Sequence, residues 1–411
     1  MRSCQKCGSQ LDESDIMCGN CGRLAPEEGE YAELQQRVKK LKGSSRRSSK
    51  RHTKRIILVT IIILFLVLPQ AAPNRDRIKE YPEDPSKIRD DMEYIWDLLN
   101  PRYYKVADTA NYKLDRKMTI QATDGSIDFS IRFPDPKNFT TQDDTFLQTI
   151  RGFTWSSSTI VLGEKSGPWI FVNGTVESGM TETVTLTYEI TSKTYEWDFL
   201  SSSKSGTVDQ IPQYLKDEYN HDESMVRDDV DRPLIDLSAV RDEAEGITEG
   251  KSNVYDKVLA IYNFVIDEVS YQVGSVPKTC TETLNGGVGD CDDMVLLFTA
   301  MCRSIGIPAY PGYGFVSNQK FQGWGGHSWA NVVIPDKDGN IFFPQIDLPN
   351  EKFLWYDPYR LIEWNADGNE ENLSDYYYVF HSSGSGNGFF SPQEFIINSY
   401  TTSGEKLIRA D

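Results

Sequence analysis

Histidine is scarce in this chain, because only four of its 411 residues are histidines, His52, His221, His327 and His381. Cysteine is scarce too, with seven residues, and basic residues are outnumbered by acidic ones, 43 to 61, for a net charge of −18. An acidic main body that is rich in aromatic residues argues against nucleic acid as its partner. Because imidazole is the most common general base in enzymes, the chain offers few candidates for that role.

Long apolar runs are also rare, and the clearest one covers residues 56–68, with small residues following up to residue 72. Residues 56–72 just reach the ~17 positions that a helix needs to cross a bilayer. A cleaved signal peptide is the alternative, but a 55-residue leader precedes the run. Residues 1–55 carry a net charge of +6, against −24 for the rest. We therefore predict a single-pass membrane protein with a cytoplasmic N-terminus and extracytoplasmic C-terminal domains.

Four of the seven cysteines form two close pairs near the N-terminus, Cys4 with Cys7 and Cys18 with Cys21. Two C-x-x-C pairs at this spacing predict a zinc site with four thiolate ligands. Two disulfides are the alternative, but the predicted cytoplasmic side is reducing. The segment resembles the small zinc-ribbon found at the front of many bacterial and archaeal membrane proteins. We expect the zinc to be structural, because four protein ligands leave no open position for catalysis.

The remaining sequence changes its periodicity along the chain. Between about residues 111 and 200 apolar and polar residues alternate, as in Val184, Leu186, Tyr188 and Ile190, which predicts an antiparallel β-sandwich-like domain. The predicted fold class is therefore multi-domain. Its segments are a zinc-ribbon (1–25), a basic charged linker (26–55), a transmembrane helix (56–72), a helix plus extracytoplasmic β domain (80–202), an acidic linker (203–234) and a final α+β domain (235–411).

The final domain is organised around the stretch 286–291, a glycine-rich loop that ends at Cys291. The residues after it predict a buried helix, because they are apolar on nearly every face until a glycine and a proline at 306–308. A helix N-terminus lowers the pKa of a thiol, whereas the aspartates around Cys291 raise it, so a neighbouring imidazole would decide the balance. A buried structural cysteine is the alternative, and Cys302 on the same helix is interpreted in that way.

A thiol nucleophile needs a base and a third group that orients the base. His327 is the best-placed histidine, because it follows a glycine loop and enters a predicted strand; a structural histidine is the alternative. Residues 335–339 form a predicted hairpin turn. If the turn is centred on residue 337, Asp347 lies directly across from His327 on the same face of the sheet. Asp357, which precedes a proline, is the other candidate for the third group.

Several of these stretches together resemble the core of the transglutaminase-like superfamily. They are Val258–Val265, Val269–Tyr271, Gly289–Asp293, Ser304–Tyr313 and Gly326–Val332. The resemblance covers about residues 235–380 and implies a papain-like α+β fold, with a cysteine at a helix start and a histidine and an aspartate on adjacent strands. It implies Cys291 as the nucleophile and His327 as the base. The family aspartate usually precedes proline at a strand end, so Asp357 fits by its proline and Asp347 by its spacing, and the third member stays open.

The predicted function is a membrane-tethered, thiol-dependent acyl-transfer enzyme with a Cys-His-Asp triad, either a cysteine peptidase or a transglutaminase-like acyltransferase. It would cleave or cross-link amide bonds of a protein or peptide substrate on the extracytoplasmic side, without a cofactor for catalysis. A catalytically silent binding module that holds an envelope partner outside the cell is one alternative. A structural envelope protein in which Cys291 forms a disulfide with Cys280 or Cys302 is another.

Overall fold

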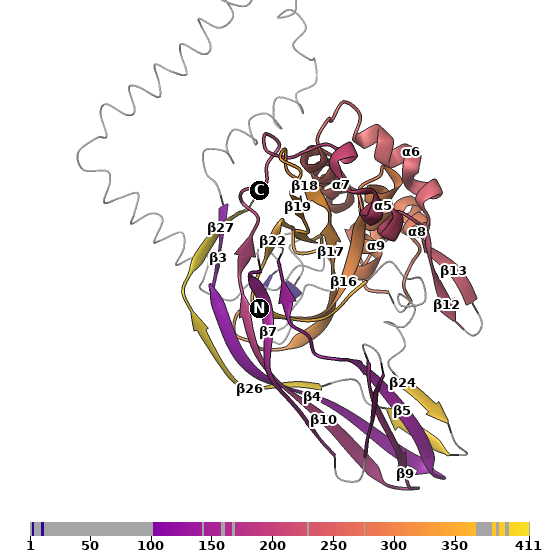
Figure 1. Cartoon of the computed structure of the whole chain (residues 1–411). Helices are drawn as coiled ribbons and strands as arrows, with labels where there is room; N and C mark the ends of the chain where they lie inside the picture. Colours follow the sequence, from indigo (N-terminus) through magenta and orange to yellow (C-terminus); the bar gives the residue numbers. More distant parts are fainter. Residues whose placement is uncertain are drawn as a thin grey trace, which may run out of the picture. The chain divides into compact units, whose positions relative to one another are not determined.

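The structure of the protein is a computed structural model (Figure 1). It describes residues 2–3, 10–11, 102–141, 144–157, 161–166, 169–227, 230–274, 276–366, 380–383, 386–390 and 394–410. The chain divides into two compact units, one of Met1–Ala25 with Tyr104–Ile408 and one of Pro26–Tyr103 with Arg409–Asp411. All described helices belong to the first unit. Near its N-terminus, β1 (Arg2–Ser3) pairs with β2 (Gln10–Leu11).

Two antiparallel sheets form a β-sandwich around one hydrophobic core. The larger sheet contains β4 (Thr109–Asp124), β6 (Phe139–Thr140), β7 (Phe146–Ser156) and β10 (Thr181–Lys193). The smaller sheet contains β5 (Ile127–Pro134), β8 (Val161–Ser166) and β9 (Trp169–Val176). The predicted alternation along β10 is confirmed, since Val184, Leu186, Tyr188 and Ile190 are all buried. Alternate side chains of a strand point to opposite faces, so one face of β10 enters the core.

Strands from the end of the chain complete both sheets of the sandwich. β25 (Asn387–Phe390) and β26 (Glu394–Ser403) pair one after the other with β4, on the side opposite β10. β24 (Phe380–Ser383) pairs with β5. The short strands β3 (Arg102–Val106) and β27 (Lys406–Ala410) pair with each other in a two-stranded sheet. The sandwich is therefore built from segments on both sides of the α+β domain, whereas the sequence had assigned residues up to 411 to that domain.

The α+β domain has a five-stranded antiparallel sheet in the order β21-β20-β17-β16-β23. These strands are Lys352–Phe353, Gln345–Asp347, Trp324–Val332, Ala309–Ser317 and Arg360–Asn365. The helices are α6 (Leu237–Ile247), α7 (Val254–Glu268), α8 (Cys280–Gly286) and α9 (Cys291–Ser304). Short pairings join β11 (Tyr195–Glu196) to β22 (Trp355–Tyr356), β14 (Ser270–Tyr271) to β15 (Val288–Gly289), and β18 (Ile334–Pro335) to β19 (Ile341–Phe342).

Helix α9 lies at the centre of this domain, packed against β16 and β17 on one side and against α6, α7 and α8 on others. Every residue from Asp293 to Ser304 is buried, so the prediction of a helix surrounded by core is confirmed. Gly306 adopts φ +84° just after the helix, a conformation that glycine reaches without the steric cost of a side chain. The chain then turns into β16.

Residues 203–234, for which the sequence predicted an acidic linker, are folded against the α+β domain. They contain the 3-10 helix η3 (Val208–Gln210), α5 (Gln213–Tyr219), β12 (Glu223–Arg227) and most of β13 (Val230–Ile235). Ile211, Leu215 and Leu234 are buried in the same core as α9. Tyr219 is buried there too, and four buried apolar side chains in 32 mostly polar residues do not stand out, which explains why the pattern suggested a linker.

The predicted transmembrane fold and single-pass membrane localisation are corrected by the structure. No helix among the described residues is both long and apolar enough to cross a membrane. The longest of them, α7, has 15 residues, whereas a spanning helix needs about 20. The segment 56–72 and residues 80–101 lie outside the described residues. The four N-terminal cysteines lie outside them too, so the zinc-ribbon stays a prediction.

Candidate active site

Cys291 is the first residue of α9 and follows the glycine-rich loop that was expected to carry it. Gly289 has no room for a side chain, because a Cβ there would lie 2.7 Å from the Cβ of Asp293. The buried Asp293 carboxylate accepts hydrogen bonds from the backbone amides of Asp290 (3.1 Å) and Lys278 (2.6 Å). These contacts join the loop to the first turn of the helix and hold Cys291 in place between them.

The surroundings of the Cys291 thiol disfavour its ionisation. Burial raises its pKa above the ordinary value, and the carboxylates of Asp292 and Asp290 raise it further. The backbone amide and hydroxyl of Ser328 lie beside the sulfur and lower the pKa in part. Burial and the two aspartates therefore outweigh the helix terminus, and the thiol is protonated at neutral pH in this state.

The Tyr271 hydroxyl also reaches the sulfur, because β14 pairs in parallel with β15 just before the helix. The Tyr271 hydroxyl lies next to the Cys291 sulfur, and burial, followed by Cys291 and the carboxylates of Asp290 and Asp292, raises the tyrosine pKa. The tyrosine thus stays a neutral hydrogen-bond donor next to the sulfur. Sequence reasoning gave Tyr271 no role in the site, since the two-residue strand that places it has no pattern of its own.

His327 and Asp347 lie together on neighbouring strands, β17 and β20. His327 Nε2 is 2.8 Å from Asp347 Oδ1, and both side chains are buried. Asn350 supports the pair, because its Nδ2 lies 3.0 Å and 3.1 Å from the two carboxylate oxygens and 3.2 Å from His327 Nε2. His327 Nδ1 is buried and has no hydrogen-bond partner among the described residues. One ring nitrogen is therefore fixed while the other is available.

The hairpin that brings the two strands together has a different register from the predicted one. Pro335 pairs with Ile341 and Ala330 pairs with Ile346, so the turn is centred one residue later than residue 337. This moves the partner strand by two positions, which keeps every side chain on its face. Asp347 is consequently a diagonal neighbour of His327 rather than its direct partner, and the carboxylate still reaches the ring.

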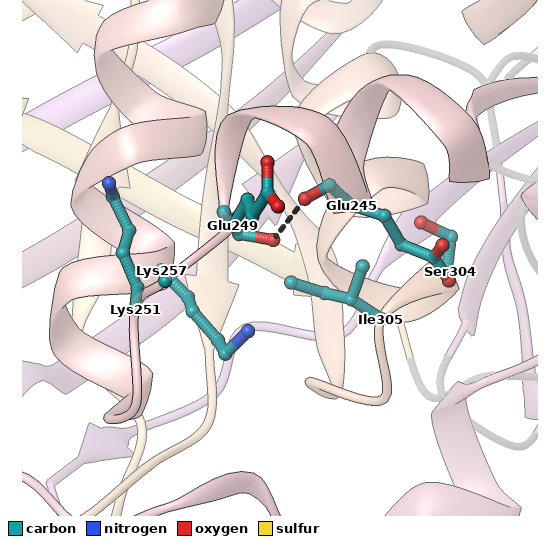
Figure 2. Close-up of a pocket in the computed structure, with 8 residues that line it drawn as sticks. Glu245, Glu249, Lys251, Lys257, Ser304 and Ile305 are labelled. Atoms are coloured by element: carbon teal, nitrogen blue, oxygen red, sulfur yellow. Dashed lines mark hydrogen bonds between the residues drawn. The ribbon is translucent and has the colours of Figure 1, made fainter.

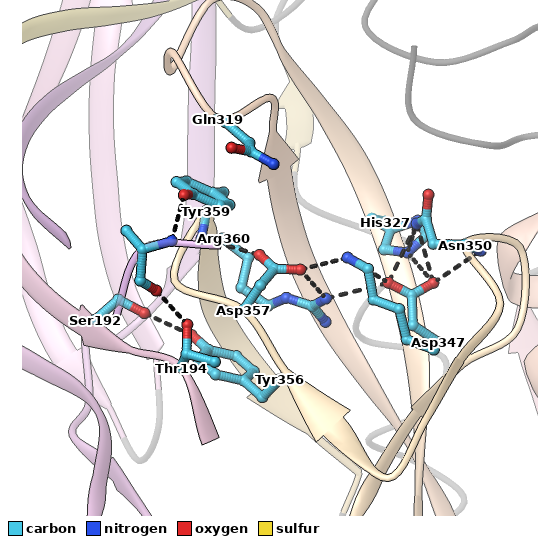
Figure 3. A network of polar contacts seen from close by, with 12 residues as sticks. Ser192, Thr194, Gln319, His327, Asp347, Asn350, Tyr356, Asp357, Tyr359 and Arg360 are labelled. Atoms are coloured by element: carbon cyan, nitrogen blue, oxygen red, sulfur yellow. Dashed lines mark hydrogen bonds and ion pairs between the residues drawn. The ribbon is translucent and has the colours of Figure 1, made fainter. Parts of the chain in front are cut away.

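Asp357 lies in a buried cluster of charges that includes Asp347 (Figure 3). Arg360 donates to Asp347 Oδ2 (3.1 Å) and to Asp357 Oδ2 (3.2 Å), and Lys352 pairs with both carboxylates, at 3.8 Å from Asp347. Lys352 and Arg360 lower the pKa of Asp357 to about 2, despite its burial. His327, Lys352 and Arg360 together hold the pKa of Asp347 well below its usual range, against the effect of burial.

The same strand connects the site to the β-sandwich. Tyr112 on β4 donates its hydroxyl to the backbone carbonyl of Arg360 at 2.6 Å. Glu363, three residues after Arg360 on β23, forms a buried ion pair with Arg116 of β4 at 2.5 Å. The side chain of Gln148 on β7 both donates to and accepts from the backbone of Ile362. The sandwich therefore fixes β23, the strand that carries Arg360.

The other described thiols are separate from this site. Cys280 and Cys302 are buried, and Cys280, Cys291 and Cys302 are all free of disulfides, which counts against the structural alternative. An open cavity of about 410 Å³ lies near the C-terminal end of α9 (Figure 2), lined on that side by Ser304 and Ile305 and elsewhere by Glu245, Thr248, Glu249, Gly250, Lys251 and Lys257. Because α9 rises about 1.5 Å per residue, the cavity at its C-terminal end is about 20 Å from the Cys291 thiol at its N-terminal end. It does not belong to the candidate active site.

Comparison with known proteins identifies the domain that carries this site. The sequence profile of the transglutaminase-like superfamily matches residues 241–344, so the chain contains a transglutaminase-like domain, typical of a family of thiol-dependent acyl-transfer enzymes. The matched region includes Cys291 and His327 and ends three residues before Asp347.

Two solved structures are similar to the chain at low sequence identity. One is a candidate cysteine protease from Cytophaga hutchinsonii, with 15% identity and a TM-score of 0.49 over 75% of this chain and 99% of that one. The other is a candidate protease from Parabacteroides distasonis, with 11% identity and a TM-score of 0.21 over 60% and 66%. At these TM-scores neither contributes to the functional argument. No curated protein matches the chain.

Proposed function

We propose that the protein is a thiol-dependent acyl-transfer enzyme in which Cys291 is the nucleophile, His327 the general base and Asp347 the group that orients the base. One observation carries the proposal: His327 Nε2 is held by Asp347 at 2.8 Å, while Nδ1 is buried and lacks a partner among the described residues. Ser328, the next residue along β17, lies beside the thiol. A base with one nitrogen fixed and one available is what a nucleophilic thiol requires.

The proposed reaction starts when His327 Nδ1 takes the proton of the Cys291 thiol. The sulfur then forms a bond to the carbonyl carbon of an amide or ester, and the carbonyl π electrons move to the oxygen. The backbone N–H of Cys291 and the hydroxyl of Tyr271 are available to hold this oxyanion, and one such donor typically contributes about 10²–10³ in rate. The imidazolium protonates the leaving group, the carbon–heteroatom bond breaks, and a thioester remains on Cys291.

The acceptor of the acyl group decides between two outcomes. Water would regenerate the thiol by hydrolysis and make the protein a peptidase or amidase, whereas an amine would make it a cross-linking transferase. We propose hydrolysis of a protein or peptide substrate, because water is always present and the sequence shows no dedicated amine pocket. No catalytic cofactor is needed for either outcome.

One observation favours a second candidate, a binding module that kept the fold without the chemistry. Burial, Asp292 and Asp290 hold the pKa of the Cys291 thiol above its ordinary value, so the resting site does not contain the preformed thiolate that activates many catalytic cysteines. In an enzyme this thiol must be deprotonated after the substrate has bound. In a binding module it would stay unreactive.

A direct test is acylation of the full chain by p-nitrophenyl acetate, measured as a burst of nitrophenol and as acetylated protein by intact mass and peptide mapping. The enzyme is expected to give a burst of one equivalent, with the acetyl group on Cys291. His327→Gln is expected to lower the burst rate by about 10²–10⁴, the usual contribution of a general base.

Cys302→Ala is the matched control, since this cysteine lies on the same helix but is fully buried, and the variant is expected to keep the burst. A burst that persists in Cys291→Ala would refute the assignment of the nucleophile. Absence of any Cys291-dependent acylation in a folded wild-type chain would support the binding module instead.

A further inference from the structure

Four charged side chains form a closed cluster behind the imidazole of His327 (Figure 3). Asp347 and Asp357 are the carboxylates, Lys352 and Arg360 are the cations, and all four residues are no more than 5% exposed. Each cation contacts both carboxylates. The cluster contains two negative and two positive charges, so it is neutral as a whole, and only Asp347 also contacts His327.

The arginine of the cluster is fixed in place. Its guanidinium lies 5.1 Å from the ring centre of Trp329 and 5.0 Å from that of Tyr356. Its backbone carbonyl accepts the hydroxyl of Tyr112 from the β-sandwich. A buried guanidinium held in this way cannot turn to solvent, so its positive charge must be balanced where it lies.

We propose that Asp357 is a positioning residue for the imidazole: it balances the charges of Lys352 and Arg360, which leaves the carboxylate of Asp347 available to stabilise the imidazolium of His327. This inference rests on the proposed roles of His327 and Asp347. Without Asp357, two cations would oppose one carboxylate directly behind the ring. With it, the cluster behind the ring stays neutral, and the proton transfer from Cys291 to His327 adds one negative and one positive charge without changing the net charge of the site.

The remaining groups around the cluster do not supply this balance. The Tyr112 and Tyr356 hydroxyls are neutral, because burial raises their pKa values, and Asn350 carries no charge. On the opposite side, Asp290 and Asp292 flank the thiol on α9. Among the described groups, Asp357 is therefore the carboxylate that meets both cations without contacting the base.

The test follows the protonation of His327 by NMR of histidine-labelled full-length protein, with the signal assigned through His327→Gln. Asp357→Asn removes a negative charge and is expected to move the titration midpoint of His327 to lower pH by about one unit, the size of one unit charge at this range in a protein interior. Lys352→Met removes a positive charge and is expected to move it to higher pH by a similar amount.

The double variant Lys352→Met/Asp357→Asn restores neutrality and is expected to return the midpoint close to that of wild type. It also keeps the proposal testable if a single variant fails to fold. The control is Glu363→Gln, which breaks the buried pair with Arg116 on the same strand as Arg360. This variant is expected to lower stability and leave the His327 midpoint unchanged.

Shifts of equal sign for the two single variants, or midpoints that stay within 0.3 unit of wild type, would overturn the inference. The same variants are then compared in the acylation assay, where the acidic limb of the pH profile, along which the base His327 loses its proton, should move with the NMR midpoint. If NMR shows the opposite shifts but no variant and no wild-type protein is acylated, the charge balance stands and the proposed enzymatic function fails. The two ideas are thus separable.

Discussion

Asp347→Asn is the substitution that perturbs the candidate site with the least change in shape. It keeps an oxygen that can accept from His327 but removes the charge and replaces one oxygen with an NH₂ group. That NH₂ group would face either Nη2 of Arg360 or Nδ2 of Asn350. In the wild-type structure each of these donors lies 3.1 Å from Asp347 Oδ2. Donor would then face donor in a buried position, and the imidazole would lose the charge that favours its protonated form.

The loss of stability follows from the desolvated charges that remain. Removing one partner of a buried ion pair costs about 3–5 kcal/mol, and Asp357 still compensates Lys352 and Arg360 in part, which favours a value of about 3 kcal/mol. At roughly 2–4 °C per kcal/mol for a protein of this size, the melting temperature should fall by about 6–12 °C. The burst rate should fall by about 10³–10⁴, the effect of the equivalent change in serine protease triads.

Differential scanning calorimetry of the full chain measures the first effect and the p-nitrophenyl acetate burst measures the second. Asp338→Asn is the matched control, because it makes the same chemical change at an exposed position of the nearby hairpin turn; it is expected to stay within about 0.5 kcal/mol of wild type. An Asp347→Asn protein with wild-type stability and burst rate would refute the role of this carboxylate in both the fold and the site.

Tyr271→Phe should lower the acylation rate by about 10–10³-fold without a comparable loss of stability, as expected for an oxyanion donor; an unchanged rate would remove it from the mechanism. Gly314→Ala should destabilise the protein by at least about 3 kcal/mol or prevent folding, because its Cβ would lie 2.0 Å from the carbonyl oxygen of Leu361, and urea titration against Gly326→Ala, which has open space, checks this. The melting temperature should fall as the pH drops from about 4 towards 2. The pKa of Asp347 is lower in the folded state than in the unfolded chain, so its ionised form stabilises the fold above that range and this stabilisation is lost as the pH falls. A melting temperature that does not change in this range would contradict the role of the buried charge cluster in stability.

The parts of the site that depend on local sequence could be predicted, and the parts that depend on distant pairing could not. The glycine-rich loop, the N-terminal position of Cys291 and the burial of α9 follow from spacing within twenty residues. Asp347 reached the face of His327 although the predicted register was two residues off, because an even shift preserves faces. A shift by one residue would have removed the carboxylate from the ring.

The charge cluster and the completion of the β-sandwich left no readable signal. Lys352 and Arg360 resemble surface residues in a sequence, since buried cations are rare and only their carboxylate partners make burial possible. β24, β25 and β26 join β4 and β5 from about 250 or more residues away, a pairing that strand patterns do not specify. The transmembrane prediction is not supported, because no helix among the described residues is long and apolar enough to cross a membrane.

The two sides of the candidate site act on its proton in opposite directions. Moving a proton from Cys291 to His327 places a positive charge beside Asp347, which favours the transfer, and a negative charge beside Asp290 and Asp292, which opposes it. In the resting state burial opposes the transfer most strongly by raising the pKa of the thiol, so the thiol keeps its proton. A substrate carbonyl changes this balance, because the developing charge moves from the sulfur to an oxygen that Tyr271 and the backbone can hold. The arrangement therefore suits a nucleophile that becomes reactive only when an acyl group is bound.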